Sequence, residues 1–207
     1  GYSAAICPDM GANCFLLERE GASFLRRPPS LEELRARPNL YGLPLLFPPN
    51  RIKDGAYEFQ DRRYRLPLNE AERGNHIHGF LSSTPFTLDS AEADGSSCSA
   101  TFSFEATREA PYSTFPHAFK AALRYSLDEK GLEQRLEIEN RSDTDMPLGL
   151  GFHAAFACPF LPGTSADDYR LRLSVSEEIL LEKPSMIPSG ARITENYLLS
   201  ALNGGAI

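Results

Sequence analysis

The chain has 207 residues, of which 42% are hydrophobic and 24% are charged, and its formal net charge is −7. This composition is typical of an ordinary globular protein and excludes a disordered chain. The acidic balance disfavours nucleic-acid binding, which relies on concentrated Lys and Arg. No apolar run approaches the roughly 18 residues that a membrane-spanning helix needs. We therefore expect neither a nucleic-acid partner nor a membrane partner.

The cysteines and the N-terminus bear on metal binding and location. Cys7, Cys14, Cys98 and Cys158 form no CxxC pair and no metal-ligand spacing, so we expect reduced, partly buried thiols and no metal. The N-terminus lacks the basic, apolar and small-residue order of a signal peptide, which predicts a cytoplasmic protein. At this length we expect a single domain over residues 1–207.

The first two predicted elements are a hairpin and a short helix. Two apolar runs, 13–17 and 23–25, flank a glycine-containing turn, which predicts the hairpin. Ser30 lies three residues ahead of Glu33, which is a capping-box pattern, so we expect one short helix near residues 30–37.

A proline-rich segment follows over residues 41–55. Its three prolines lack the N–H group that a central strand needs, so we expect a rigid, partly extended loop that ends in a turn at Asp54-Gly55. Residues 56–59 and 64–66 then predict a second hairpin, with two arginines near its bend.

From residue 100 onward, apolar and polar residues alternate. Residues 101–105, 119–127 and 132–139 predict three strands, and residues 170–175 repeat the alternation. Many short strands with almost no helical period predict an all-β fold, either an antiparallel β-sandwich or a related architecture.

Two histidines and an arginine are candidates for small-molecule acid–base chemistry. His153 lies among Gly and Ala residues, where a substrate can approach closely; the alternative is a core histidine satisfied by a backbone carbonyl. We expect at most one of His76 and His78 to face a given pocket. Arg51 carries donors that suit hydroxyl or carboxylate oxygens, although loop arginines are more often held by backbone carbonyls. His117 has no motif around it and is equally interpreted as a bystander.

The motifs of several other enzyme classes are absent from the sequence. There is no GxSxG elbow, no P-loop and no GxGxxG, so serine hydrolase, NTPase and dinucleotide-binding functions have no support. The basic cluster at residues 62–65 is typical of a solvated strand face. The residues alone therefore indicate an all-β protein with a His/Arg site and do not specify a reaction.

An ordered set of motifs resembles the aldose 1-epimerase (galactose mutarotase) family. Asn50-Arg51-Ile52 resembles the Asn-Arg-Ile element of the family, and Asn75-His76-Ile77-His78-Gly79 resembles its Asn-x-Leu-His-Gly element. His153 and Phe156 correspond to its catalytic His-Pro-Tyr-Phe segment, and Ile187-Pro188-Ser189-Gly190 resembles its Ile-Pro-Thr-Gly. The resemblance covers most of the chain.

The resemblance implies a β-supersandwich fold and interconversion of the α and β anomers of a free aldose, without a cofactor or metal. It implies catalytic roles for His153 and His78, with His153 as the general acid that protonates the ring oxygen. It also implies that Arg51, Asn50 and His78 bind the substrate. In the family a glutamate accepts the proton of the C1 hydroxyl, so acid and base act together.

Two departures from the family pattern are clear. Ala154-Ala155 stands where the family usually has Pro-Tyr. The family's substrate-binding aspartate and glutamate base have no match before Ile207, so we expect the domain to be incomplete at its C-terminus. Four carboxylates precede that region in family order and are interpreted more simply as surface charges. They are Glu177, Glu178, Glu182 and Glu195.

Two alternatives to a mutarotase stay open. A non-catalytic sugar-binding or regulatory module is consistent with the unmatched base, and unpaired sheet edges would favour a homodimer. A hexose-6-phosphate epimerase needs basic residues near the pocket, for which Lys53, Arg62 and Arg63 are candidates. In each case the expected partner is a small sugar, either a hexose or a pentose.

Overall fold

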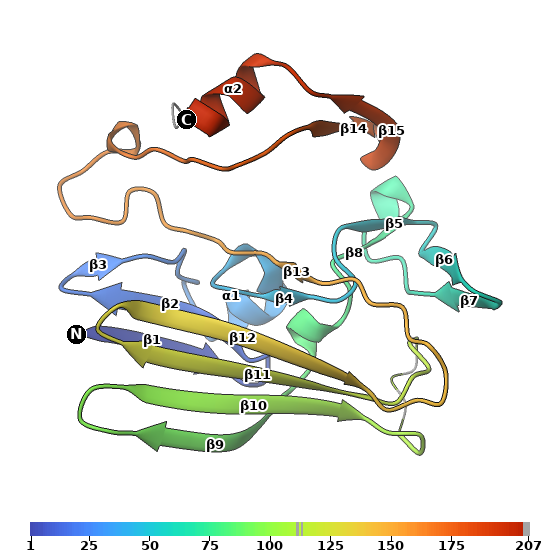
Figure 1. The fold of residues 1–207 in the computed structure, drawn as a ribbon, viewed down its shortest axis with the longest axis horizontal. Helices are drawn as coiled ribbons and strands as arrows, with labels where there is room; N and C mark the ends of the chain where they lie inside the picture. Colours follow the sequence, from blue (N-terminus) through green and yellow to red (C-terminus); the bar gives the residue numbers. More distant parts are fainter. Residues whose placement is uncertain (111, 113, 205–207) are drawn as a thin grey trace.

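The computed structural model describes residues 1–110, 112 and 114–204, and most of its regular structure is antiparallel β-strand (Figure 1). The prediction of an all-β antiparallel fold is confirmed. The strands are β1 (Tyr2–Cys7), β2 (Asn13–Arg19), β3 (Ala22–Ser23), β4 (Leu45–Leu46), β5 (Arg51–Lys53), β6 (Ala56–Phe59), β7 (Arg62–Arg65), β8 (Asn75–Ile77), β9 (Thr87–Ala93), β10 (Cys98–Ala106), β11 (Phe119–Asp128), β12 (Gly131–Asn140), β13 (Gly151–Phe152), β14 (Glu178–Glu182) and β15 (Ile187–Ile193). The helices are α1 (Leu31–Ala36) and α2 (Tyr197–Gly204), with short 3-10 turns η1 (Pro38–Leu40), η2 (Ala71–Arg73), η3 (Leu81–Ser83) and η4 (Ala166–Asp168). Within the described residues, neither helix has the length and apolar character needed to cross a bilayer.

The largest sheet has the strand order β12-β11-β10-β9 and contains the three long strands that the alternation predicted. Phe119, Ala121, Leu123 and Tyr125 of β11 are buried, and the residues between them are more exposed, as the period of two requires. β11 pairs with β12 in an unbroken antiparallel register over its whole length. The apolar face of this hairpin therefore packs on the core, and its charged face meets solvent.

Phe47 anchors the proline-rich segment in the hydrophobic core. Its side chain is fully buried, and its ring centroid lies 5.4, 5.2 and 5.7 Å from those of Phe80, Phe115 and Phe119. Edge-on contacts of this kind are favourable for aromatic rings. The predicted turn at Asp54-Gly55 is confirmed, because the Gly55 N–H donates to the carbonyl of Ile52 at 3.1 Å and both residues have positive φ. The segment is less irregular than predicted, since it also contains β4 and β5.

The helix and both hairpins predicted in the first third of the chain are confirmed. The Ser30 hydroxyl accepts a hydrogen bond from the Glu33 N–H at 3.1 Å and caps α1. β2 pairs with β3, and β6 pairs with β7. The prediction did not include β1, which pairs with β2 at the start of the chain.

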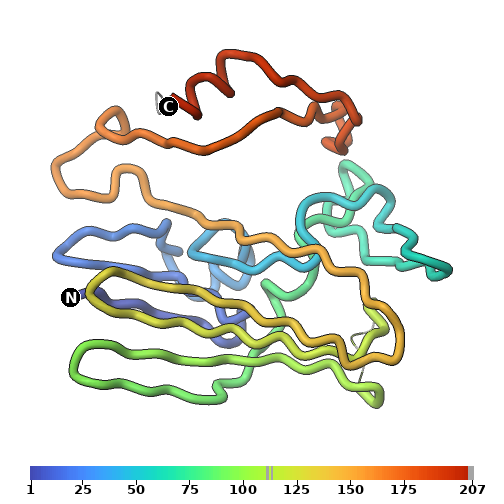
Figure 2. The backbone as a smooth tube through the Cα atoms, in the orientation of Figure 1, coloured from blue at the N-terminus to red at the C-terminus, as the bar shows by residue number. Residues whose placement is uncertain are grey.

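The strand predicted over residues 170–175 is wrong, and a second helix, α2, was not predicted. The Leu173 N–H donates to the carbonyl of Leu202 at 3.2 Å, and the Asn203 amide donates to the carbonyl of Val175 at 2.9 Å. The segment therefore lies against α2 and not beside another strand. Alternating apolar and polar residues form a strand only when a neighbouring strand accepts and donates their backbone hydrogen bonds. Figures 1 and 2 show this last third of the chain running away from the four-stranded sheet to the opposite side of the view, where β14, β15 and α2 lie.

Gly79 allows the chain to pass directly against Phe47. The two residues form a parallel bridge, and a Cβ atom at position 79 would lie 2.0 Å from the Phe47 carbonyl oxygen. Gly79 also has a φ of +70°, a conformation that a side chain disfavours.

We therefore expect Gly79→Ala to reduce the free energy of unfolding by at least about 2 kcal/mol, because it adds both a clash and backbone strain. Urea unfolding followed by circular dichroism measures the loss. Gly95→Ala is the control, since its Cβ meets nothing within 4 Å, and it should change the free energy by less than about 0.5 kcal/mol. Equal losses in the two variants would contradict the close approach at Gly79.

Candidate functional site

The two histidines that the sequence analysis selected lie next to each other. The ring centroids of His78 and His153 are 5.1 Å apart, and the ring planes are inclined at 55°. These residues come from distant parts of the chain, so only the fold brings them together. Two adjacent imidazoles can exchange protons with one bound molecule.

His153 is placed by the short pairing of β13 with β4. Its N–H donates to the carbonyl of Pro44 at 3.0 Å, directly after the pair Phe152↔Leu45. A Cβ atom at Gly151 would lie 2.9 Å from Pro49, so the glycine allows β13 to approach the proline-rich segment. The His153 side chain is exposed, which argues against its alternative interpretation as a core histidine.

His78 is placed by the other end of the same segment. Its N–H donates to the carbonyl of Asn50 at 2.9 Å, and its φ is +66°. In a regular strand, residues two apart share a face, so the left-handed backbone at His78 is what separates its side chain from that of His76. His76 is buried and donates from Nδ1 to the carbonyl of Pro67 at 2.7 Å. Of these two histidines, His78 is the one whose ring lies beside that of His153.

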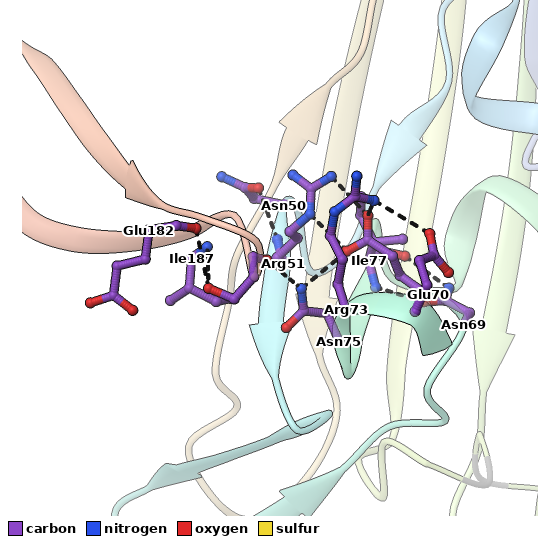
Figure 3. A network of polar contacts seen from close by, with 11 residues as sticks. Asn50, Arg51, Asn69, Glu70, Arg73, Asn75, Ile77, Glu182 and Ile187 are labelled. Atoms are coloured by element: carbon purple, nitrogen blue, oxygen red, sulfur yellow. Dashed lines mark hydrogen bonds and ion pairs between the residues drawn. The ribbon is translucent and has the colours of Figure 1, made fainter.

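Arg51 forms a bidentate ion pair with Glu70. Its Nε donates to Oε2 and its Nη2 to Oε1, both at 2.8 Å (Figure 3). Arg51 is therefore held by a carboxylate and not by backbone carbonyls. No described residue accepts a hydrogen bond from its Nη1, which leaves that group free for a ligand oxygen. Asn50 has a structural part in this arrangement, since its Oδ1 accepts the Arg51 N–H at 2.9 Å.

The Glu70 carboxylate is buried and accepts four hydrogen bonds. Besides the two from Arg51, it accepts one from Arg73 Nη1 at 2.9 Å and one from Asn75 Nδ2 at 3.1 Å. The hydrogen bonds from Arg51, supported by those from Asn75 and Arg73, lower the pKa of Glu70 to about 2. Sequence reasoning missed Glu70, because a glutamate between two motifs looks like any surface charge until its partners are known.

Burial is the main cause that lowers the pKa of His78, to about 4, and positive charge at His153 and Arg51 lowers it further. His78 is therefore neutral near pH 7. Its Nδ1 is buried without a partner among the described residues, so Nε2 is the nitrogen that can meet a ligand.

His117 and Arg62 belong to a different cavity, of about 240 Å³. His117 is buried, with Nε2 2.8 Å from the Tyr64 hydroxyl and Nδ1 3.1 Å from the Ser142 hydroxyl. Arg62 donates to the carbonyl of Pro116 at 3.4 Å. His117 therefore has a structural role, as its bystander interpretation expected.

The four late carboxylates do not reach the imidazole pair in the described part of the chain. Glu177 pairs with Arg192, and Glu178 accepts a hydrogen bond from the Asn196 amide at 2.6 Å. Glu182 points its carboxylate away from Arg51 (Figure 3), and Glu195 is exposed. Among the described residues, no group of three or more His, Cys, Asp or Glu side chains is arranged to hold a metal ion.

Comparisons with known proteins identify relatives of this chain. The sequence model of the family described as Aldose 1-epimerase matches residues 1–197. The protein YihR of Escherichia coli (strain K12) is 28% identical over 130 residues, which cover 62% of this chain and 39% of YihR. The chromosomal protein LacX of Lactococcus lactis subsp. lactis is 28% identical over 144 residues, which cover 68% of this chain and 44% of LacX.

Comparison with solved structures identifies proteins with a similar fold. A galactose mutarotase-like protein from Clostridium acetobutylicum has a TM-score of 0.92 at 35% identity, covering 99% of this chain and 62% of that one. The galactose 1-epimerase from Lactobacillus acidophilus NCFM has a TM-score of 0.71 at 18% identity, covering 94% of this chain and 55% of that one. The predicted mutarotase-like fold is confirmed, and the chain spans less than two thirds of each of these relatives.

We expect the ring of His78 to titrate near pH 4, and the pKa of His78 to rise in His153→Ala, because a neighbouring positive charge is removed. Since the folded pKa lies below the ordinary value of 6.5, the stability that depends on neutral His78 is present above about pH 6.5 and is lost as the pH falls through 4. NMR titration of the imidazole Cε1–H signals measures these values. Arg63→Ala removes an exposed cation elsewhere and should leave the pKa of His78 unchanged. A His78 midpoint near 6.5 would contradict this environment.

Proposed function

Because the chain belongs to the aldose 1-epimerase family, we propose that its site interconverts the α and β anomers of a free aldose. The observation that carries this proposal is the contact between His78 and His153, with the bound guanidinium of Arg51 beside them. The arrangement offers two imidazoles side by side, of which His78 is neutral, and a fixed cation close to His78. These groups can transfer protons to and from oxygen atoms of a substrate and can stabilise charge that develops on them.

In the proposed reaction, His153 gives a proton to the ring oxygen while a base removes the proton of the C1 hydroxyl. The C1–O5 bond breaks, the aldehyde turns about C1–C2, and closure on the other face reverses both proton transfers. His78 is neutral and can hydrogen-bond to a sugar oxygen through Nε2. The free Nη1 of Arg51 binds a further hydroxyl and stabilises negative charge that develops on it.

The base of this reaction is not among the described carboxylates. Glu70 is the carboxylate bound to Arg51, but its low pKa and four hydrogen bonds leave it without proton affinity or free lone pairs. A complete catalyst of this design therefore takes its base from elsewhere in the whole protein. Turnover by residues 1–207 alone would therefore need a base in addition to the groups that bind a sugar, whereas sugar binding would not.

Charge compensation favours a neutral sugar over a sugar phosphate. Glu70 neutralises Arg51, and Arg73 is shared between Glu70 and Glu72. Arg62, one of the basic residues considered for a phosphate, lies beside His117 instead. A phosphate at the histidine pair would find no uncompensated arginine within this network.

A second candidate function is sugar binding without catalysis. The observation that favours it is the absence, among the described residues, of a carboxylate paired with either imidazole. Arg51 and His78 are sufficient for hydrogen bonding to hydroxyl groups, whereas turnover needs both an acid and a base.

Polarimetry of freshly dissolved α-glucose and α-galactose tests the proposal. We expect the whole protein, which supplies the base, to accelerate anomerisation, and His153→Ala in it to reduce the rate at least 100-fold, the typical contribution of a general acid. Glu182→Ala is the control and should leave the rate unchanged, because its carboxylate points away from Arg51. Sugar binding without acceleration would favour the second function. Neither binding nor acceleration with any common aldose would refute both.

A further inference from the structure

We propose that Glu70 is a positioning residue of the sugar site, which acts by fixing the guanidinium of Arg51, and that Asn75 supports it. This inference rests on the proposed function, since Arg51 is the group that would touch the sugar. The observation behind it is the bidentate pair, in which both oxygens of one buried carboxylate bind one arginine at 2.8 Å.

The geometry of the pair decides which part of Arg51 stays available. A guanidinium has five N–H donors in one plane, and Glu70 takes the edge formed by Nε and Nη2. The opposite edge, with both protons of Nη1 and the second proton of Nη2, is not used by any described residue. Two adjacent donors at that edge match two neighbouring oxygens, such as vicinal hydroxyls. Fixing one edge therefore orients the other.

The surroundings of Glu70 keep it from moving. Its side chain is 8% exposed, and a buried carboxylate is tolerated only when it is well paired. Arg51 accounts for two of its four hydrogen bonds and Asn75 for a third. Arg73 supplies the fourth from the solvent side, where it also pairs with Glu72 at 3.3 Å. Arg51 and Asn75 are therefore the partners that hold the carboxylate from inside the protein.

Asn75 connects this pair to a distant part of the chain. One Nδ2 proton goes to Glu70 (Figure 3). The other goes to the carbonyl of Ser185 at 2.7 Å, in the turn between β14 and β15. Asn75 is 1% exposed, so this double contact is shielded from water. The β14–β15 hairpin is thus docked on the element that positions Arg51.

The guanidinium is also near the imidazole pair. Arg51 pairs with Ile77 in the β5–β8 ladder, directly before His78, and Asn50 gives its carbonyl to the His78 N–H at 2.9 Å. The charge of Arg51 contributes to the lowered pKa of His78, which requires the two groups to be close.

The test is a double-mutant cycle on the sugar affinity and on kcat/KM, with Glu70→Gln, Arg51→Ala and the double variant. Glu70→Gln should weaken sugar binding or kcat/KM roughly tenfold to 100-fold, mainly through KM, because glutamine cannot accept both N–H groups. In the Arg51→Ala background the same change should have less than a twofold effect. Arg73→Ala, which leaves the bidentate pair in place, should change both quantities less than twofold.

A second readout is independent of sugar. In ¹⁵N NMR spectra, the fixed guanidinium of Arg51 should give separate, slowly exchanging Nη protons, and these signals should merge in folded Glu70→Gln. Unaltered guanidinium signals, or a Glu70→Gln effect that persists without Arg51, would overturn the positioning role. If the native chain binds no sugar while the guanidinium signals behave as expected, the proposed function fails and the fixing of Arg51 by Glu70 stands. Circular dichroism establishes that each variant is folded.

Discussion

The candidate site depends on a single proline-rich segment that gives one backbone carbonyl to each histidine. The carbonyl of Pro44 accepts the N–H of His153, and the carbonyl of Asn50 accepts the N–H of His78. Between these two points, Phe47 is buried against three aromatic rings. The prolines restrict the backbone of this segment, and the buried Phe47 side chain holds the segment against the core. The distance between the histidines is therefore set by the core and not by mobile loops.

The electrostatics of the site follow from the same placement. Holding Arg51 partly buried would be costly without a counter-charge, and Glu70 supplies one with good geometry. The pair is internally neutral, so the local field at the imidazoles is modest and the burial of His78 is the main cause of its lowered pKa. His78 can therefore stay neutral near pH 7 in this environment.

Sequence reasoning succeeded where the signals were local. The long strands β10, β11 and β12 and the capped helix α1 were predictable because alternation and caps act over a few residues. The histidines and Arg51 were found through their motifs, but the approach of the His78 and His153 rings to 5.1 Å was not predicted. Glu70 could not be found, because its importance comes from partners that only the fold brings together. The failure at residues 170–175 has the same origin, since a strand also needs a partner.

In the proposed function, His153 is the acid, Arg51 and His78 are the binding groups, and no described carboxylate is assigned as the base. These requirements are physically separable. Hydrogen bonding to a sugar needs only oriented donors and acceptors, which Arg51 and His78 provide. Turnover needs two proton transfers, of which His153 can supply one. Under this proposal, affinity and rate report different parts of the site: affinity would depend on the Arg51–Glu70 unit, and rate would depend on His153 together with a base.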